Sequence, residues 1–162
     1  MRFVILPFLF TLLHAQENKK EENKDDFPSV VSKQDAVTIA GKKIDYKVTA
    51  STLSLKTAKD EDRASIFHVS YERIGMTDRH KRPIVFAFNG GPGSSAVWLH
   101  MGALGPRIVP TTPDGTKSLP PPLTVKENPQ SILDVADIVF IDPVSTGFSR
   151  AEGKTKADEF HG

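Results

Sequence analysis

The sequence of 162 residues contains no cysteine, and it carries almost no excess of charge of either sign. Without cysteine, these residues can form neither a disulfide framework nor a thiolate metal site. Lysine and arginine number 21 against 20 aspartates and glutamates, so no basic field is available to gather a nucleic-acid backbone. The five histidines are scattered without the spacing of metal ligands. The composition therefore argues against metal chemistry and against a nucleic-acid partner.

The sequence also lacks an apolar run long enough to cross a bilayer as a helix, which needs about 20 residues. Its first apolar run, Phe3–Leu13, follows Arg2 and precedes the small residue Ala15. This pattern predicts a secretory signal peptide at residues 1–15, with an uncleaved membrane anchor as the alternative. Pro7 and the immediate change to charged residues favour cleavage. We therefore expect a secreted or periplasmic protein that has no membrane association after cleavage.

The segment after the predicted signal peptide is highly charged at its start and has little to bury. We expect residues 16–35 to form a disordered linker, because such a composition cannot offset the entropy of ordering. Ordered chain is expected from Ala36, so that residues 36–162 form one domain. Apolar residues recur at a loose period of two over Val37–Val48 and again over Ile66–Tyr71. This spacing predicts antiparallel strands at the edge of a sheet.

Two continuous apolar runs follow, Ile84–Phe88 and Ile138–Ile141. Runs without alternation are typical of strands buried on both faces, as in the central parallel part of an α/β sheet. Three other features are expected between them: a helix capped by Ser94 or Ser95 and ending at Leu104, a surface loop over Pro110–Pro122, and a helical turn from Asn128 through Ala136. The chain as a whole is therefore predicted to have an α/β fold.

The most informative segment is Asn89-Gly90-Gly91-Pro92-Gly93, directly after the first apolar run. Glycines at a strand end allow either a tight turn or a loop whose backbone N–H groups point at negative charge. A phosphate-binding loop is rejected, because no lysine follows Gly93 in the required position. The glycines do not match a dinucleotide-binding fingerprint either. A turn and an anion-stabilising loop remain as the two interpretations.

The strings FNGGPGSSAVWLHMGALGPRIV and NPQSILDVADIVFIDPVSTGFSR together resemble two consecutive blocks of the serine carboxypeptidase family. The likeness extends over roughly Val37–Arg150 and implies a partial α/β-hydrolase fold. In that fold, amino-terminal antiparallel edge strands lead into a mostly parallel central sheet, which would be incomplete in this chain. Ser145 departs from the family pattern, which usually has glycine there, and this leaves the local turn open. The absence of the cysteine that follows the loop in eukaryotic relatives favours a bacterial-type member.

The resemblance also implies roles for three residues of the loop. Gly91 would supply a backbone N–H to the oxyanion hole. Asn89 and Gly90 would bind the free carboxylate of the substrate, which is a peptide or protein C-terminus. The alternative for Asn89 is a side chain that only braces its own loop. No cofactor or metal is implied.

A catalytic triad is missing from the sequence, since no G-x-S-x-G nucleophile motif occurs. Ser149 lies in the closest string but lacks the second glycine, and Asp142 precedes any possible nucleophile although the acid follows it in this fold. His100 is interpreted as a packed histidine, and His161 is the last residue but one. We expect the chain to be the amino-terminal third or so of a longer enzyme, inactive and poorly stable alone.

Two alternatives to a serine carboxypeptidase stay open at this point. One is an acyltransferase on the same scaffold, which needs the same loop. The other is a secreted binding or remnant protein that kept the glycine loop and lost its catalytic half.

Overall fold

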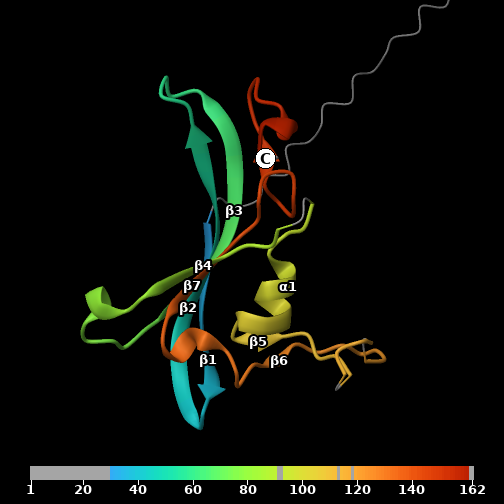
Figure 1. Ribbon diagram of the computed structural model, residues 1–162. Helices are drawn as coiled ribbons and strands as arrows, with labels where there is room; N and C mark the ends of the chain where they lie inside the picture. Colours follow the sequence, from blue (N-terminus) through green and yellow to red (C-terminus); the bar gives the residue numbers. More distant parts are fainter. Residues whose placement is uncertain (1–29, 91–92, 113, 118, 161–162) are drawn as a thin grey trace, which may run out of the picture.

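The computed structural model describes residues 30–90, 93–112, 114–117 and 119–160 (Figure 1). Within these residues, six strands form one mixed sheet in the order β1-β2-β3-β7-β4, with β8 paired to β3 beside this path. The strands are β1 (Val30–Ile39), β2 (Lys42–Lys56), β3 (Asp62–Arg73), β4 (Ile84–Ala87), β7 (Asp137–Ile141) and β8 (Arg150–Ala151). A separate pair is formed by β5 (Arg107–Ile108) and β6 (Lys126–Glu127). The helical segments are η1 (Arg79–Lys81), α1 (Val97–Leu99), the π-helical η2 (His100–Leu104), η3 (Ile132–Asp134) and η4 (Ala157–Phe160).

The first three strands form an antiparallel meander. β1 and β2 are joined by a two-residue turn at Ala40 and Gly41, both of which have positive φ, as a tight hairpin requires. β2 and β3 continue as a long hairpin arm. The carboxyl-terminal part of the chain lies beside this arm, where β8 pairs with β3 (Figure 1).

The start of β1 corrects a prediction from the sequence. Residues 30–35 were expected to belong to a disordered linker, but they pair with residues 46–51 of β2. This pairing gives their backbone N–H and C=O groups partners, and it orders a segment that has little to bury. The charged residues 16–29 and the predicted signal peptide at 1–15 lie outside the described residues.

β7 occupies the centre of the sheet, although it comes late in the sequence. It runs antiparallel to β3, with Val69 opposite Phe140, and parallel to β4, with Phe86 opposite Val139. The connection between β3 and β4 is short and reverses the chain, so β7 fills the space between two antiparallel strands. In the described residues β4 and β7 are therefore the single parallel pair, and the sheet is mixed rather than mostly parallel.

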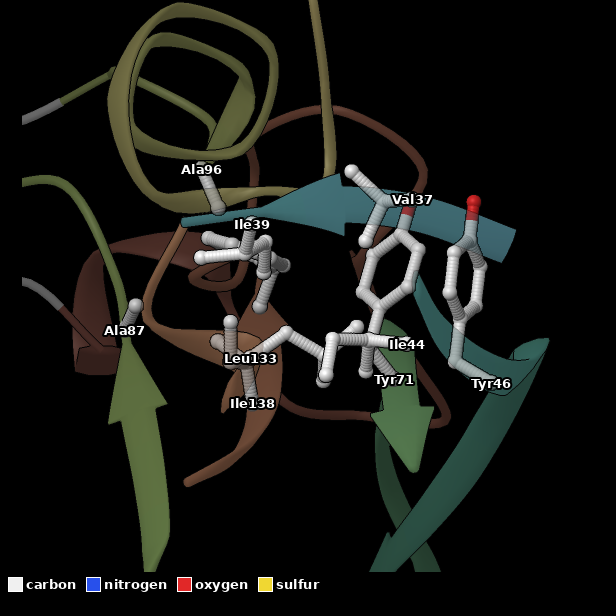
Figure 2. Close-up of a cluster of buried hydrophobic side chains, with 10 residues drawn as sticks. Val37, Ile39, Ile44, Tyr46, Tyr71, Ala87, Ala96, Leu133 and Ile138 are labelled. Carbon is white, nitrogen blue, oxygen red and sulfur yellow. The ribbon is translucent and has the colours of Figure 1, made fainter. Parts of the chain in front are cut away.

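The hydrophobic core lies on one face of this sheet. Its members are Val37, Ile39, Ile44, Tyr46, Tyr71, Ala87, Ala96, Leu133, Ile138 and Phe140. Figure 2 shows Ala96, from the segment that leads into α1, and Leu133 of η3 packed against side chains of the strands. Leu99 and Leu104 add partly buried contacts from α1 and η2. Fully burying one such aliphatic side chain contributes about 1.5–3 kcal/mol.

The opposite face of β4 is open, which contradicts the expected burial of this strand on both faces. Ile84 and Phe86 are 57% and 61% exposed, whereas Ala87, whose side chain points to the other face, is 6% exposed. In β7, Ile138 and Phe140 are buried, and Asp137, Val139 and Ile141 are partly buried. The reason is that α1, η2 and η3 all pack on the core side of the sheet.

The predicted helix before Gly105-Pro106 is present, but its form and its cap differ from expectation. α1 and η2 together span Val97–Leu104. Neither Ser94 nor Ser95 caps α1, because the N-cap residue is Ala96 and no side chain forms a capping hydrogen bond there. In the second predicted helical segment, η3 is a single 3-10 turn whose N-cap, Ser131, accepts a hydrogen bond from Leu133 N at 3.4 Å.

Candidate active-site loop

The glycine-rich segment runs from the end of β4 to the start of α1. Gly93 has a φ of +96°, a conformation that residues with a side chain rarely adopt, so the chain turns where glycine is needed. A Cβ atom placed on Gly90 would meet no heavy atom within 4 Å. The space beside Gly90 is therefore open and not filled by the described chain. Gly91 and Pro92 lie outside the described residues, so the predicted oxyanion role of Gly91 stays a prediction.

Asn89 lies at the beginning of this loop, directly after Phe88. Its side-chain Oδ1 is buried and has no hydrogen-bond partner among the described residues, and it is the one such side-chain atom found in them. Buried polar atoms in folded proteins nearly always have a partner, and an exception requires an explanation. No bond from the Asn89 side chain to its own loop is present in the described part of the chain. The contact that would brace the loop is therefore not seen there.

Asp142 follows β7 and reaches the same region from the neighbouring strand. Because β4 and β7 are parallel, Asn89 and Asp142 follow strand ends at the same edge of the sheet. Asp142 Oδ1 accepts a hydrogen bond from Ala96 N at 2.9 Å, and Oδ2 accepts one from Phe148 N at 3.4 Å. The residue is 8% exposed. Its carboxylate thus contacts the end of the glycine-rich segment and the turn after β7.

The sequence argued only against Asp142 as a triad acid, and this contact was not predicted from it. The available signal was its position, since a carboxylate directly after a buried strand lies where loops of neighbouring parallel strands meet. In the described residues no hydrogen bond joins the Asp142 carboxylate to His100, and its bonds go to backbone amides. This arrangement differs from that of a triad acid, which orients a histidine.

Ser149 is fully buried beneath Asp142. Its hydroxyl donates to the carbonyl oxygen of Asp142 at 2.7 Å and accepts from Phe67 N at 2.8 Å. A nucleophile needs an exposed hydroxyl next to a base. The observed bonds instead use the hydroxyl to join β3 to the segment after β7, and they favour a structural role for this serine.

His100 is the first residue of η2, and its ring packs against the sheet. Its Nε2 lies 2.7 Å from the Tyr71 hydroxyl, and its ring stacks on Phe140 with centroids 4.5 Å apart. Burial lowers the pKa of His100, and the charge of Asp142 opposes this effect. Burial also raises the pKa of Tyr71. The surroundings of His100 are those of a packed histidine. His161 lies outside the described residues.

A hollow of about 330 Å³ opens next to this region. It is lined mostly by apolar side chains of β3, β7 and α1, and Ser95, His100 and Asp142 are its polar members. Nowhere in the described ranges do three or more histidine, aspartate or glutamate side chains gather as a metal site would require. In the same part of the chain, no helix is both long and apolar enough to span a bilayer.

Comparisons with known proteins agree with this architecture. Residues 45–160 match the family model described as serine carboxypeptidase. The chain is also similar to the crystal structure of Kex1(Δ)p, a prohormone-processing carboxypeptidase from Saccharomyces cerevisiae, at 25% sequence identity and a TM-score of 0.52. The similarity covers 67% of this chain and 22% of that one, so this chain spans less than a quarter of the length of that relative. No curated protein matches. Because the family model matches most of its length, the chain belongs to the serine carboxypeptidase family.

Proposed function

We propose that the protein is a serine-type carboxypeptidase, which hydrolyses C-terminal peptide bonds through an acyl-enzyme, and that this chain supplies the loop that binds the C-terminal carboxylate. Family membership supports the reaction class. The observation that carries the assignment to the loop is the Asn89 side chain, whose buried Oδ1 has no partner among the described residues, beside the open space at Gly90.

The amide of Asn89 and the backbone N–H of Gly90 suit a carboxylate chemically. An amide N–H₂ group and a main-chain N–H can each donate to a carboxylate oxygen, and a hydrogen bond to a charged group contributes roughly 1.5–3 kcal/mol. An enzyme that binds the free carboxylate in this way distinguishes a chain end from an internal peptide bond. This is how the proposed site selects peptide and protein C-termini as substrates.

Gly91 is proposed to stabilise the transition state. Attack of a serine hydroxyl on the scissile carbonyl places negative charge on the former carbonyl oxygen, and a backbone N–H from the loop would neutralise it. Loss of one such donor typically lowers the rate by about 10² to 10³. Glycine suits this position, because a side chain would crowd the substrate.

The proposal concerns the activity of the whole protein, since the described residues hold no nucleophile, base and acid in a triad arrangement. A polypeptide limited to these 162 residues is expected to be inactive. The signal-peptide pattern at residues 1–15 supports the further proposal that the protein is secreted or periplasmic.

Replacement of Asn89 in the protein as its gene encodes it tests the clamp. With N-blocked dipeptides, Asn89→Ala should raise KM for the substrate with a free carboxyl group by about 10- to 100-fold, from the hydrogen-bond energy above. KM for the matching amidated substrate should change little. Ser94→Ala on the same loop is the matched control, because its hydroxyl makes only a 3.4 Å bond to Ser95 O.

Three results would contradict parts of the proposal. Equal effects of Asn89→Ala on the two substrates would exclude a carboxylate clamp. Binding of a peptide C-terminus by the wild type without turnover would identify a binding protein. Transfer of the acyl group to an alcohol or amine in preference to water would identify an acyltransferase.

A further inference from the structure

The start of α1 depends on a bond from outside the helix. α1 has only three residues, and no side chain of its own N-terminal segment caps it. Ala96 is 2% exposed, so its N–H group lies out of reach of water and needs an acceptor inside the protein. That acceptor is Oδ1 of Asp142, which lies 46 positions further along the sequence.

The backbone of Asp142 is itself fixed on the sheet. Its N–H donates to Phe67 O in β3 at 3.0 Å, and its carbonyl oxygen accepts from the buried Ser149 hydroxyl. The carboxylate is thus held by the strands, while the atom that it contacts belongs to the loop. The bond from Ala96 N to Asp142 therefore holds the end of the glycine-rich segment in a fixed place relative to the sheet.

The chain also keeps the space around the carboxylate free. A Cβ atom on Gly147 would lie 1.8 Å from Asp142 Oδ2 and 3.2 Å from the Cβ of Ser95. Any side chain at position 147 would therefore push the carboxylate away from its place. Among the described residues Asp142 has no ion-pair partner, and its side-chain bonds go to the amides of Ala96 and Phe148.

We infer that Asp142 is a positioning residue of the proposed active site, whose carboxylate holds the Ala96 end of the loop that begins at Asn89. Ala96 follows Gly93 by three positions, so a shift at Ala96 is passed directly into the glycine-rich segment. The inference rests on the proposed function, because it deepens the role of the same loop. It assigns to Asp142 no contact with the substrate.

The test uses the protein as its gene encodes it and compares three variants. Asp142→Ala removes both acceptors, whereas Asp142→Asn keeps one oxygen for Ala96 N. Ser131→Ala is the structural control, since it removes a different buried hydroxyl, which donates to Leu104 O at 2.7 Å, and leaves Asp142 and the bonds that hold it. For a free-carboxyl dipeptide, Asp142→Ala should lower kcat/KM by about 10- to 100-fold, because small displacements of catalytic groups are costly. Asp142→Asn should restore kcat/KM to within about threefold of wild type.

Ser131→Ala should lower the melting temperature and leave kcat/KM within about threefold of wild type when assayed well below that temperature. If Ser131→Ala and Asp142→Ala lowered kcat/KM equally, the carboxylate would have only a structural role. If Asp142→Asn were as impaired as Asp142→Ala, the hydrogen bond from Ala96 N to the side chain of residue 142 would not be the interaction that supports activity. Either result would overturn the inference.

A second measurement separates this inference from the proposed function. Exchange of the Ala96 amide hydrogen should be at least about tenfold faster in Asp142→Ala than in wild type and in Asp142→Asn. The amide of Glu152, which donates to Arg63 O, should be unaffected. Equal exchange at Ala96 in all three proteins would contradict the positioning role. A wild-type protein without hydrolytic activity would contradict the proposed function and leave the exchange result to decide about Asp142.

Discussion

Arg82 and Asp137 form a buried ion pair in which Nε of the arginine lies 2.7 Å from Oδ1 of the aspartate. Their side chains are only 4% and 14% exposed. The same carboxylate oxygen accepts a hydrogen bond from Arg73 N at 2.9 Å, and the Arg82 guanidinium donates to carbonyl oxygens of η3. One pair therefore joins the end of β3, the start of β4 and the start of β7.

Removal of the carboxylate from this pair should be strongly destabilising. Asp137→Ala leaves the Arg82 charge buried without its charged partner, and breaking a buried pair in this way typically costs about 3–5 kcal/mol. Urea unfolding of the protein measures the change in the free energy of unfolding. Asp45→Ala is the matched control, because the Lys43–Asp45 pair is 72% and 53% exposed and should contribute less than about 1 kcal/mol. Similar losses in the two variants would contradict the prediction.

Stability should depend on pH through His100. Burial lowers the pKa of His100 in the folded protein from its ordinary value of 6.5, so the unfolded chain takes up the proton first as the pH falls. The contribution of His100 is therefore fully present above pH 6.5, and it is lost as the pH falls through the lower folded pKa.

Urea unfolding of wild type and His100→Phe at about pH 7.5 and about pH 5 tests this dependence. The variant should lose less stability than wild type between the two pH values. His80→Gln, at an exposed position, should behave as wild type does. A wild-type and a His100→Phe protein with the same pH dependence would exclude His100 as its source.

Ser145 should be a site of stabilisation by glycine. The residue has a φ of +70°, which costs a residue with a side chain about 1–2 kcal/mol and costs glycine almost nothing. Since glycine also raises the entropy of the unfolded chain, Ser145→Gly should stabilise the protein by a net 0.5–1 kcal/mol, roughly. Ser145→Val should be destabilising, because a β-branched residue fits positive φ poorly. Thermal unfolding of the two variants measures both changes in stability. A loss of stability in Ser145→Gly would contradict the inference that the backbone at Ser145 is strained.

The open face of β4 should make the 162-residue polypeptide prone to association. Ile84, Phe86 and Phe88 are all more than half exposed, and a large exposed apolar patch binds partners or aggregates. Phe86→Ser should reduce binding of an apolar dye and shift sedimentation toward the monomer. Leu53→Ser, which removes an equally exposed apolar side chain from the hairpin arm, should have a smaller effect. No difference between the two variants would mean that this face is not the associating surface.

The strands could be predicted from the apolar pattern, since the alternation over Ile66–Tyr71 falls within β3 and the continuous run Ile138–Ile141 falls within β7. The end of the helical segment could also be predicted, because Gly105-Pro106 stops it. Membership of the serine carboxypeptidase family was indicated by two sequence blocks and is confirmed by the family match over residues 45–160.

The features that could not be predicted depend on contacts between distant residues. The hydrogen bond to the N–H of Ala96, the residue before α1, comes from Asp142, and local rules consider only neighbouring serines. The exposure of Phe86 depends on which face the helical segments cover, and a continuous apolar run does not record this. The ordering of residues 30–35 depends on β2, because these residues have little of their own to bury.

The central place of β7 has a consequence for how the chain is made. β3 and β4 leave the ribosome well before residue 137, so the nascent chain has both flanking strands and lacks the one that joins them. Local pairing of β1, β2 and β3 can form during synthesis, since it links neighbours along the chain. β7 is synthesised last of these strands and pairs with both β3 and β4, which are already present. This late pairing completes the sheet from which the glycine-rich loop extends.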